Sequence, residues 1–494
     1  MRFRFVLAGL CVLGMAETPG WAQSQPSPYY REAPRVAPLP DPGIPPLPQW
    51  KLVPPGKKPV MGAVNAGPGL DGPNVHDLAP RGYVEEEYFL AGTGNVYTTG
   101  GKGVAEANVP YITRILMRRP KDPSNFSGNV IIEPSRDVNE WTTTWPSAAP
   151  YMLSHGDIFV AFTMAKANLP TFFHGYDKER YASLSIPDEG LRWDIMAQTA
   201  GLMRSPTGPL AQLGFFVSAS SKKGGFRIIS TGTSLTGGMQ SAFIDNGHHA
   251  RALRRDGGPV MDGFLILVSS RPKVLPPDAP VIALVAEGDM ARNAQRMVMQ
   301  RAADADGPTR FRWYELAGTG HANWEDQSQF TPAFQLIGAK EKSTVRCQVP
   351  VSEVAAKVDF TTAALSNLQV WLREGTPPPP GRVLELNADG SLKRDANGNA
   401  LGGVRPHWVA VPASTIMPVS AEAEGSAQIP ATGGLCGMFA TEKPFTAEQR
   451  AKLYKDRADY LAQVERHLTA LVAQRYLLPG GKVHQMKQIE AMTW

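Results

Sequence analysis

A serine at a predicted strand–helix junction is the first residue whose setting could support chemistry. Residues 226–245 read FRIISTGTSLTGGMQSAFID, an apolar run followed by small residues and then an apolar, helix-like segment that begins at Leu235. A serine nucleophile needs a tight turn at the end of a rigid strand, with small neighbours two positions to either side. Gly232 meets this need before Ser234, whereas Thr236 follows it. The pattern is therefore G-x-S-x-x-G rather than G-x-S-x-G.

A serine hydroxyl is a poor nucleophile unless a base removes its proton. The chain has nine histidines, and His321 stands in a Gly-rich loop, YELAGTGHANWED, after a late predicted strand. An acid should lie between nucleophile and base in the chain. The segment PVIALVAEGDMA offers Glu287 and Asp289. We favour Asp289, because a carboxylate a short turn beyond the strand can reach the far imidazole nitrogen; Glu287 is the alternative.

Each of these residues also has an ordinary structural interpretation. Ser234 could cap a helix, His321 could be a loop histidine, and Asp289 could cap the next helix. The three residues nevertheless occur in the required order, each at the end of a predicted strand. This arrangement favours a catalytic triad of Ser234, Asp289 and His321.

A developing oxyanion needs backbone donors near the nucleophile. The turn at Ser234 would direct the Leu235 amide and the helix N-terminus at that charge. A second donor should come from VIIEPSRDVNEW, the loop after the third core strand. Pro134 has no N–H, so we expect Ser135 to serve, with Arg136 as the alternative.

The elements that would position these residues follow an α/β pattern. Apolar segments predict strands, and helical patterns between them indicate a mostly parallel sheet that is covered on both faces. The predicted strands are 83–92, 111–120, 128–135, 156–165, 226–232, 262–270, 280–289 and 310–318, and the helices include 191–203 and 235–245.

The C-terminal part of the chain has a different pattern. A helix over 359–375 should stop at TPPPP, and LNADGSLKRDANGNALGG predicts a hairpin with turns at Asp389-Gly390 and Asn397-Gly398. Thr446 and Gln449 form a capping box. We expect the helix that it opens to pack on the core through a face made of Leu461, Val464, Leu468 and Leu471.

The N-terminus predicts export. Arg2 and Arg4 precede a short apolar run, and small residues suit cleavage after Ala22, so residues 1–22 are expected to be a signal peptide. Residues 23–50 are Pro-rich and predict an extended lead. No later apolar run is long enough to span a membrane. The net charge of +5, without Lys/Arg runs, argues against nucleic-acid binding.

Two cysteines remain after such cleavage, Cys347 and Cys436. In an exported chain they predict one disulfide rather than two separate buried thiols. The bond would close a loop of about 90 residues, worth on the order of 4 kcal/mol. No cysteine or carboxylate cluster indicates a metal site, and we expect no cofactor.

Several segments together resemble a known family. They are YVEEEYFLAGTGNVYT, PYITRILMRRP, KERYASLSIP, TGTSLTGG, AEGD, AGTGHA and WLREGTPPPP. In these the chain is similar to exported bacterial alpha/beta hydrolase domain proteins. The resemblance implies the α/β-hydrolase fold and a Ser-Asp/Glu-His triad. The expected organisation is a core over 51–345 and a C-terminal extension over 346–494 in the same globule.

The expected activity is that of a serine hydrolase, most simply one that cleaves a small or polymeric carboxylic ester through an acyl-enzyme. Two alternatives stay open. The scaffold could belong to a non-catalytic exported binding protein, since a fold does not fix a function. The same triad could instead act on a lactone or an amide, or in acyl transfer. The oligomeric state is not predicted.

Overall fold

A computed structural model describes most of the chain between residues 43 and 494. The residues outside this description are 1–42, 44, 63–77, 137–139, 141, 221, 223–224, 253–256, 276, 293–309, 323–346, 353, 356, 422, 424–435 and 493. The predicted signal peptide, most of the predicted lead and the boundary expected near residue 345 lie among them, so these remain predictions.

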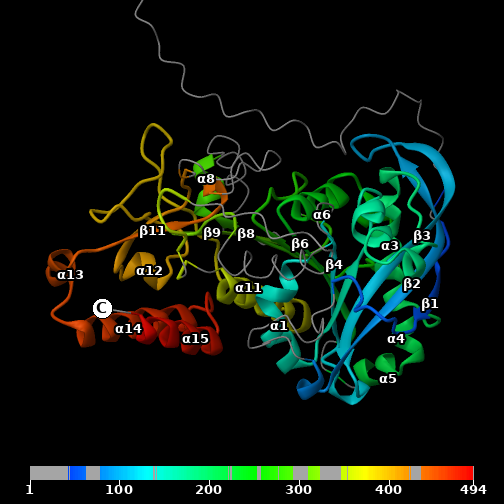
Figure 1. Ribbon diagram of the computed structural model, residues 1–494, viewed down its shortest axis with the longest axis horizontal. Coiled ribbons are helices and arrows are strands. Elements are labelled where there is room, and N and C mark those ends of the chain that lie inside the picture. The colour runs from blue at the N-terminus through cyan, green and yellow to red at the C-terminus, as the bar shows by residue number, and fades with distance from the viewer. Residues whose placement is uncertain are drawn as a thin grey trace, which may run out of the picture.

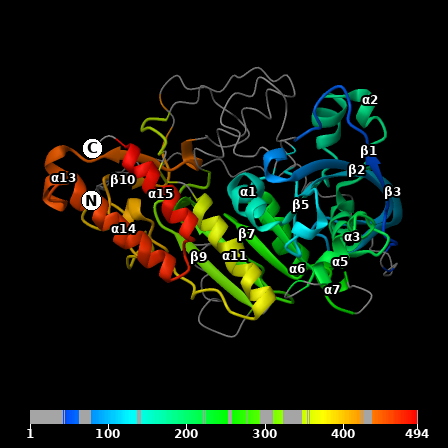
Figure 2. The ribbon, with the colours of Figure 1, turned by 90° about the horizontal axis from the view of Figure 1, so that it is seen from below.

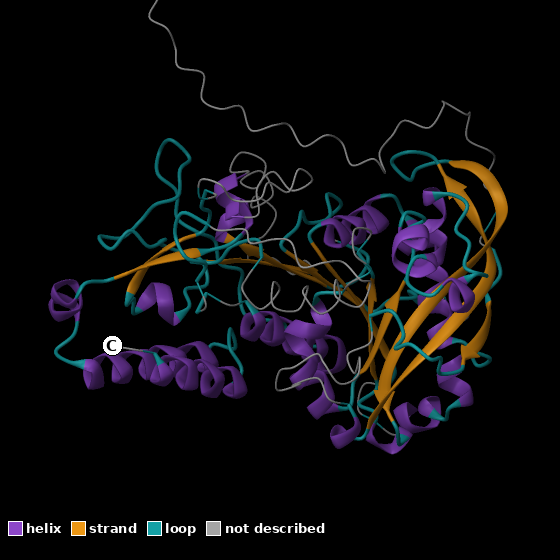
Figure 3. Cartoon of the chain, in the orientation of Figure 1, coloured by secondary structure: helices purple, strands orange, loops and turns teal. Residues whose placement is uncertain are grey.

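A nine-stranded twisted sheet crosses the described part of the molecule (Figures 1 and 3). In sheet order its strands are β1 (Gln49–Val53), β2 (Tyr83–Tyr97), β3 (Val104–Pro120), β5 (Ile158–Phe162), β4 (Asn129–Pro134), β6 (Arg227–Thr233), β7 (Gly263–Leu267), β8 (Val281–Ala286) and β9 (Phe311–Leu316).

Neighbouring strands from β5 to β9 are parallel, whereas β1, β2, β3 and β5 pair antiparallel. Every residue of β4, β5, β7 and β8 is buried, as expected for parallel strands that are covered on both faces. All eight predicted strands are present, so the predicted α/β architecture is confirmed. The carboxyl ends of the parallel strands meet at one edge, where the candidate residues should gather.

Helices cover both faces of the sheet (Figures 1 and 2). On one face α1 (Thr144–His155) packs against α11 (Val358–Glu374). On the other lie α3 (Arg192–Arg204) and α6 (Leu235–Asp245), within a residue of where the sequence predicts them. Shorter described helices are α2 (Lys178–Tyr181), α4 (Pro209–Gln212), α5 (Phe215–Ser220), α7 (His248–Arg251) and α8 (Glu287–Arg292).

The C-terminal extension begins with α11, which ends at Gly375 in the left-handed conformation. The two predicted turns are present, although isolated bridges join their arms instead of one regular hairpin. The later elements are α12 (His407–Ala410), β10 (Ser414–Met417), the short 3₁₀ helix η6 (Cys436–Met438), β11 (Thr441–Pro444), α13 (Ala447–Leu453), α14 (Arg457–Ala473) and α15 (Pro479–Ala491).

Two predicted boundaries are wrong. The predicted lead over 23–50 ends too late, because Gln49 and Trp50 already belong to β1 and pair with β2. The capping box of Thr446 and Gln449 is present, but it opens the seven-residue α13. The four predicted apolar residues lie on the next helix, α14, whose N-cap is Asp456. Val464, Leu468 and Leu471 are buried in the core cluster, and Leu461 is half-buried against it.

Candidate active site

Three candidate residues meet at the carboxyl edge of the sheet. Ser234 follows β6, Asp289 follows β8 and His321 follows β9. The Ser234 Oγ lies 2.8 Å from His321 Nε2, and His321 Nδ1 lies 2.6 Å from Asp289 Oδ1. A carboxylate can only accept, so Nδ1 carries the proton, and Nε2 is left to accept from the serine hydroxyl. The side chains of His321 and Asp289 are 14% and 9% exposed, so the hydrogen bond between them is largely shielded from water.

A strained turn presents the serine. Ser234 has φ 57° and ψ −115°, a conformation that non-glycine residues rarely adopt. Its N–H donates to the Leu267 carbonyl oxygen of β7 at 2.9 Å, which fixes the turn to the sheet. A Cβ atom at Gly232 would lie 2.6 Å from the Thr236 carbonyl oxygen. Glycine two positions before the serine is therefore required by the close approach of the helix.

Thr236 accounts for the departure from G-x-S-x-G. Its hydroxyl accepts from the Thr233 N–H at 2.9 Å and donates to the Thr233 carbonyl oxygen at 3.0 Å. The side chain is fully buried. A hydroxyl residue thus closes the turn where a glycine is more usual. Sequence reasoning missed this role, although a short hydroxyl side chain three residues after Thr233 is a recognisable signal for local bonding to the backbone.

The two candidate acids have different surroundings. Asp289 faces His321, and its second oxygen accepts from the Ala286 N–H at 3.3 Å. Glu287 is fully buried, accepts from the Gly318 N–H at 2.6 Å and pairs with Arg394 at 2.6 Å. Burial raises the pKa of Glu287, and the Arg394 charge opposes that rise. Asp289 therefore contacts the imidazole of His321, whereas the alternative acid, Glu287, contacts the backbone of the loop that carries His321.

Of the two expected oxyanion donors, the Leu235 N–H is suitably placed, whereas the Ser135 N–H already has a backbone acceptor. Leu235 is the first residue of α6, where backbone N–H groups have no acceptor within the helix. The Ser135 N–H instead donates to the Phe162 carbonyl oxygen at 2.8 Å, so the prediction for Ser135 is wrong. The reason is that the chain continues the β4–β5 pairing for one residue beyond β4. Residues 137–139 of the same loop lie outside the description.

A buried carboxyl anchors the start of α1 beside β6. Glu133, in β4, accepts from the Thr143 and Thr144 N–H groups, each at 3.0 Å. The Thr144 hydroxyl in turn donates to the Thr231 hydroxyl of β6 at 3.0 Å. Burial raises the pKa of Glu133 to about 7, and the Thr143 and Thr144 donors limit the rise. This carboxyl ties the helix after the β4 loop to the strand that carries the serine.

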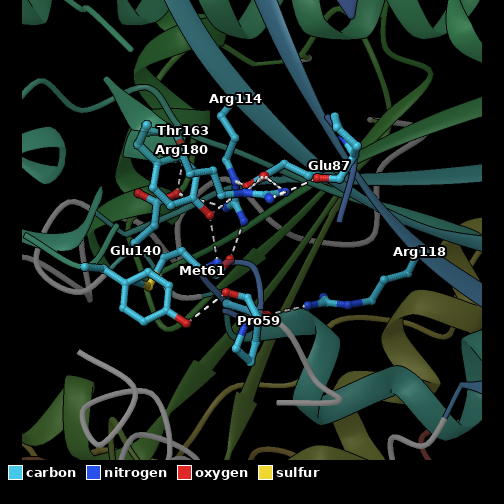
Figure 4. Close-up of polar contacts among 12 residues, drawn as sticks. Pro59, Met61, Glu87, Arg114, Arg118, Glu140, Thr163 and Arg180 are labelled. Atoms are coloured by element: carbon cyan, nitrogen blue, oxygen red, sulfur yellow. Dashed lines mark hydrogen bonds and ion pairs between the residues drawn. The ribbon is translucent and has the colours of Figure 1, made fainter. Parts of the chain in front are cut away.

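A buried ionic network includes Glu140, near the end of the loop between β4 and α1 (Figure 4). Arg114 pairs with Glu87 at 2.7 Å and approaches Glu140 at 3.8 Å. Arg180 pairs with the second Glu87 oxygen at 2.6 Å. The Thr163 hydroxyl donates to Glu140 at 2.5 Å. These contacts fix the end of the β4–α1 loop to β2, β3 and the residue after β5.

Two further features complete the comparison with the sequence. Cys347 and Cys436 form the predicted disulfide, with their Cα atoms 5.5 Å apart. Trp145, in α1, is buried in the core and contacts Arg118 and Phe159. Within the residues that the structure describes, no group of three or more His, Cys, Asp or Glu side chains is arranged to hold a metal ion. Nor does any helix there combine the length and the apolar character needed to cross a membrane.

Comparison with solved structures finds distant similarities. The esterase Est22 is 14% identical with a TM-score of 0.32, and the match covers 55% of this chain and 83% of that one. A dienelactone hydrolase from Anabaena variabilis is 13% identical with a TM-score of 0.28, and covers 46% and 90%. These TM-scores are too low to carry an argument about activity. No curated protein matches the chain in sequence.

The family comparison is more extensive than these structural similarities. A family model described as alpha/beta hydrolase domain matches residues 48–487. The match includes the whole nine-stranded sheet from β1 to β9 and continues through the C-terminal extension into α15. It therefore covers all three residues that meet at the sheet edge. The chain belongs to the alpha/beta hydrolase domain family.

Proposed function

We propose that the protein is a serine hydrolase that cleaves carboxylic esters through an acyl-enzyme. The observation that carries this proposal is the continuous hydrogen-bonded chain from Ser234 through His321 to Asp289. Its geometry matches the needs of a nucleophile, a base and an orienting acid. Membership of an alpha/beta hydrolase family supports the same class of chemistry.

In acylation, His321 Nε2 takes the Ser234 hydroxyl proton while Oγ attacks the ester carbonyl carbon. Asp289 holds the imidazole in the correct tautomer and stabilises its positive charge. The Leu235 N–H and the positive end of α6 stabilise the oxyanion. His321 then returns the proton to the alcohol oxygen as the carbon–oxygen bond breaks, leaving the acyl group on Ser234.

In deacylation, a water molecule takes the place of the alcohol. His321 removes one proton from this water as its oxygen attacks the acyl carbon, and the same Leu235 donor stabilises the second oxyanion. Collapse of the intermediate releases the carboxylic acid and returns the proton to Ser234 Oγ. The same residues therefore serve both halves of the reaction.

The direct test is hydrolysis of p-nitrophenyl esters, from acetyl to dodecanoyl, by the parent protein and by Ser234→Ala. We expect Ser234→Ala to reduce kcat on the order of 10⁶-fold. Ser220→Ala is the matched control, because this hydroxyl is on an exposed residue and donates to the Val217 carbonyl oxygen. Unimpaired hydrolysis in Ser234→Ala would overturn the proposal.

Covalent labelling distinguishes a non-catalytic binding protein from an enzyme that does not accept p-nitrophenyl esters. A fluorophosphonate reacts with an activated serine whatever the natural ester is. Labelling of the parent at Ser234, and its loss in Ser234→Ala, would support the triad even if no p-nitrophenyl ester is turned over. Absence of both labelling and turnover would favour the non-catalytic binding protein.

The site of action forms part of the same proposal. The basic start, the short apolar run and the small residues near Ala22 favour removal of residues 1–22 during export. N-terminal sequencing of the mature protein from the periplasm or medium should give Gln23 as the first residue. Retention of Met1 in the cytoplasm would contradict export.

A further inference from the structure

The loop that carries His321 contacts both the residues after β8 and the C-terminal extension. It comprises residues 317–322, between the end of β9 and the last described residue of that stretch. Glu287 and Gly288 contact it from the core side, and its other backbone hydrogen bonds described by the structure are with residues after 346, in the C-terminal extension. The contacts with the extension bear on catalysis, because the loop sets where the imidazole lies.

The buried ammonium group of Lys357 contacts the loop at the histidine itself. Its Nζ donates to the carbonyl oxygens of Gly320 at 3.1 Å and of His321 at 3.0 Å. Lys357 is 8% exposed and is the N-cap residue of α11. Placing a charged group in this position is costly unless hydrogen bonds compensate it. Two of those bonds go to the His321 loop.

An indole fixes the other end of the loop. Trp408 Nε1 donates to the Gly318 carbonyl oxygen at 3.0 Å, and the Ala317 N–H donates to the Val404 carbonyl oxygen at 3.0 Å. Trp408 is 3% exposed and packs edge-on against Phe360 of α11. The ring is therefore rigid enough to locate the carbonyl that it contacts.

The third contact comes from a segment that the disulfide anchors. The Ala322 N–H donates to the Met438 carbonyl oxygen at 2.9 Å, and Ala322 bridges to Phe439. A Cβ atom at Gly320 would collide with the Ala440 nitrogen and the Met438 oxygen. Cys436, at the start of this segment, is fully buried and bonded to Cys347. The two backbones are thus in direct contact next to His321.

We propose that Lys357, Trp408 and residues 436–440 form a C-terminal clamp that positions His321 for catalysis. This inference rests on the proposed function and extends it to residues far from the nucleophile. The described hydrogen bonds of the clamp are with backbone atoms of the histidine loop, so its members are positioning residues that act through His321. The clamp fixes both sides of the histidine loop so that one imidazole reaches Ser234 and Asp289 at once, and the Cys347–Cys436 bond fastens it.

The mildest test changes one hydrogen bond. Trp408→Phe removes the indole donor to Gly318 and keeps an aromatic ring in place. We expect kcat for ester hydrolysis to fall roughly tenfold with KM unchanged, because misplaced catalytic groups slow the chemical step. Trp50→Phe is the matched control, since its Nε1 also donates to one carbonyl oxygen, that of Thr207 at 2.9 Å, away from the site.

A second pair of variants tests the lysine. Lys357→Met keeps the length of the side chain and removes both bonds to the loop, so we expect kcat to fall on the order of 10²-fold. Lys482→Met is the matched control, because it also removes two side-chain bonds, from α15 to Glu465 and Thr469 of α14, and neither bond involves the histidine loop. Unchanged kcat in both Trp408→Phe and Lys357→Met would overturn the clamp.

A further readout does not depend on turnover. The proton shared by His321 and Asp289 should give a downfield proton resonance in the parent protein. We expect Trp408→Phe and the double variant Cys347→Ser/Cys436→Ser to weaken or shift it, at temperatures where circular dichroism finds both folded. If the double variant does not fold, Trp408→Phe alone decides the question. An unchanged resonance in Trp408→Phe would contradict the clamp.

Failure of the proposed function is distinguishable from failure of the clamp. If the parent shows neither fluorophosphonate labelling nor turnover, the serine hydrolase proposal is rejected, whatever the variants do. If the parent is active and the clamp variants retain both kcat and the resonance, only the clamp proposal is rejected and the serine hydrolase proposal stands. An active parent with slow, folded clamp variants would support both.

Discussion

The backbone of Ser234 stores strain where the nucleophile is needed. A non-glycine residue at φ 57° and ψ −115° costs about 1–3 kcal/mol relative to a relaxed conformation. Glycine avoids this cost, but its greater loss of chain entropy on folding costs about 0.5–1 kcal/mol relative to alanine. Strain should exceed the entropy term at this site.

We therefore expect Ser234→Gly to be more stable than Ser234→Ala by about 1 kcal/mol. Both variants lack the hydroxyl, so the comparison isolates the backbone. The free energy of unfolding in urea, extrapolated to water, measures it. Equal stabilities, or greater stability for Ser234→Ala, would show that the turn is not strained in solution.

The two neighbouring carboxyls should respond differently to conversion to amides. Asp289→Asn would place an amide against His321 Nδ1 and favour the wrong tautomer, so kcat should fall on the order of 10⁴-fold with little change in melting temperature. Glu287→Gln would weaken the contacts to Arg394 and Gly318 and lower the free energy of unfolding by about 1–3 kcal/mol. Kinetics and thermal melts of both variants test this. The opposite pattern would make Glu287 the acid.

Residue-scale prediction from the sequence reached Ser234 and His321 because each follows a strand in a distinctive setting. It favoured Asp289 but kept Glu287 as the alternative, because the two stand two positions apart after the same strand. The structure separates them because the chain enters α8 at once, and the helix turns one carboxyl toward His321 and the other toward Gly318. Nothing in the local pattern encodes that rotation.

The β2–β3 pair carries a buried charge arrangement whose stability can be tested. Glu87 is the shared partner of Arg114 and Arg180, and its side chain is fully buried. Glu87→Gln would leave two guanidinium groups short of a counter-charge. We expect the free energy of unfolding to fall by about 3–5 kcal/mol.

An exposed ion pair elsewhere in the chain provides the control for the buried Glu87 network. Glu385 and Lys393 lie 3.1 Å apart with both side chains half exposed. Glu385→Gln should change the free energy of unfolding by less than about 1 kcal/mol, because solvent screens such pairs. Urea unfolding of both variants gives the comparison. Similar losses would mean that the Glu87 network contributes no more than a surface pair.

At the scale of elements, apolar periodicity predicted the sheet well, because buried parallel strands leave long apolar runs. It failed where short polar segments decide the boundary. Asp456 caps α14 two residues after Tyr454 ends α13, and no apolar gap marks this break. The pairing of β1 with β2 was also hidden, because QWKLV is a short strand with no buried residue and directly follows the Pro-rich segment.

Histidine burial should make the stability of the whole molecule depend on pH. His407, in α12, is 2% exposed and contacts Gln485 of α15 at 2.8 Å. Burial lowers its pKa from 6.5 to about 4. Between these values the unfolded chain binds more protons than the folded one. Stability from neutral His407 is therefore present above about pH 6.5 and is lost as pH falls toward 4.

The variant His407→Asn should remove this dependence. We expect the stability of the parent, relative to His407→Asn, to decline by up to about 3 kcal/mol between pH 6.5 and pH 4. Urea unfolding at several pH values measures the difference between the two proteins. Because all other groups titrate in both proteins, a constant difference would show that His407 is not kept neutral by folding.

The clamp also has a consequence for when the protein becomes active during its synthesis. Cys436 leaves the ribosome 115 residues after His321 (436 − 321), a delay of roughly 6–23 s at elongation rates of about 5–20 residues per second. A nascent chain thus holds all three triad residues before it holds the segment that aligns them. If clamp and export act as proposed, ester cleavage reaches its full rate only after the clamp has formed and the cysteines are oxidised, so a chain still in the cytoplasm is a slower enzyme than the exported one.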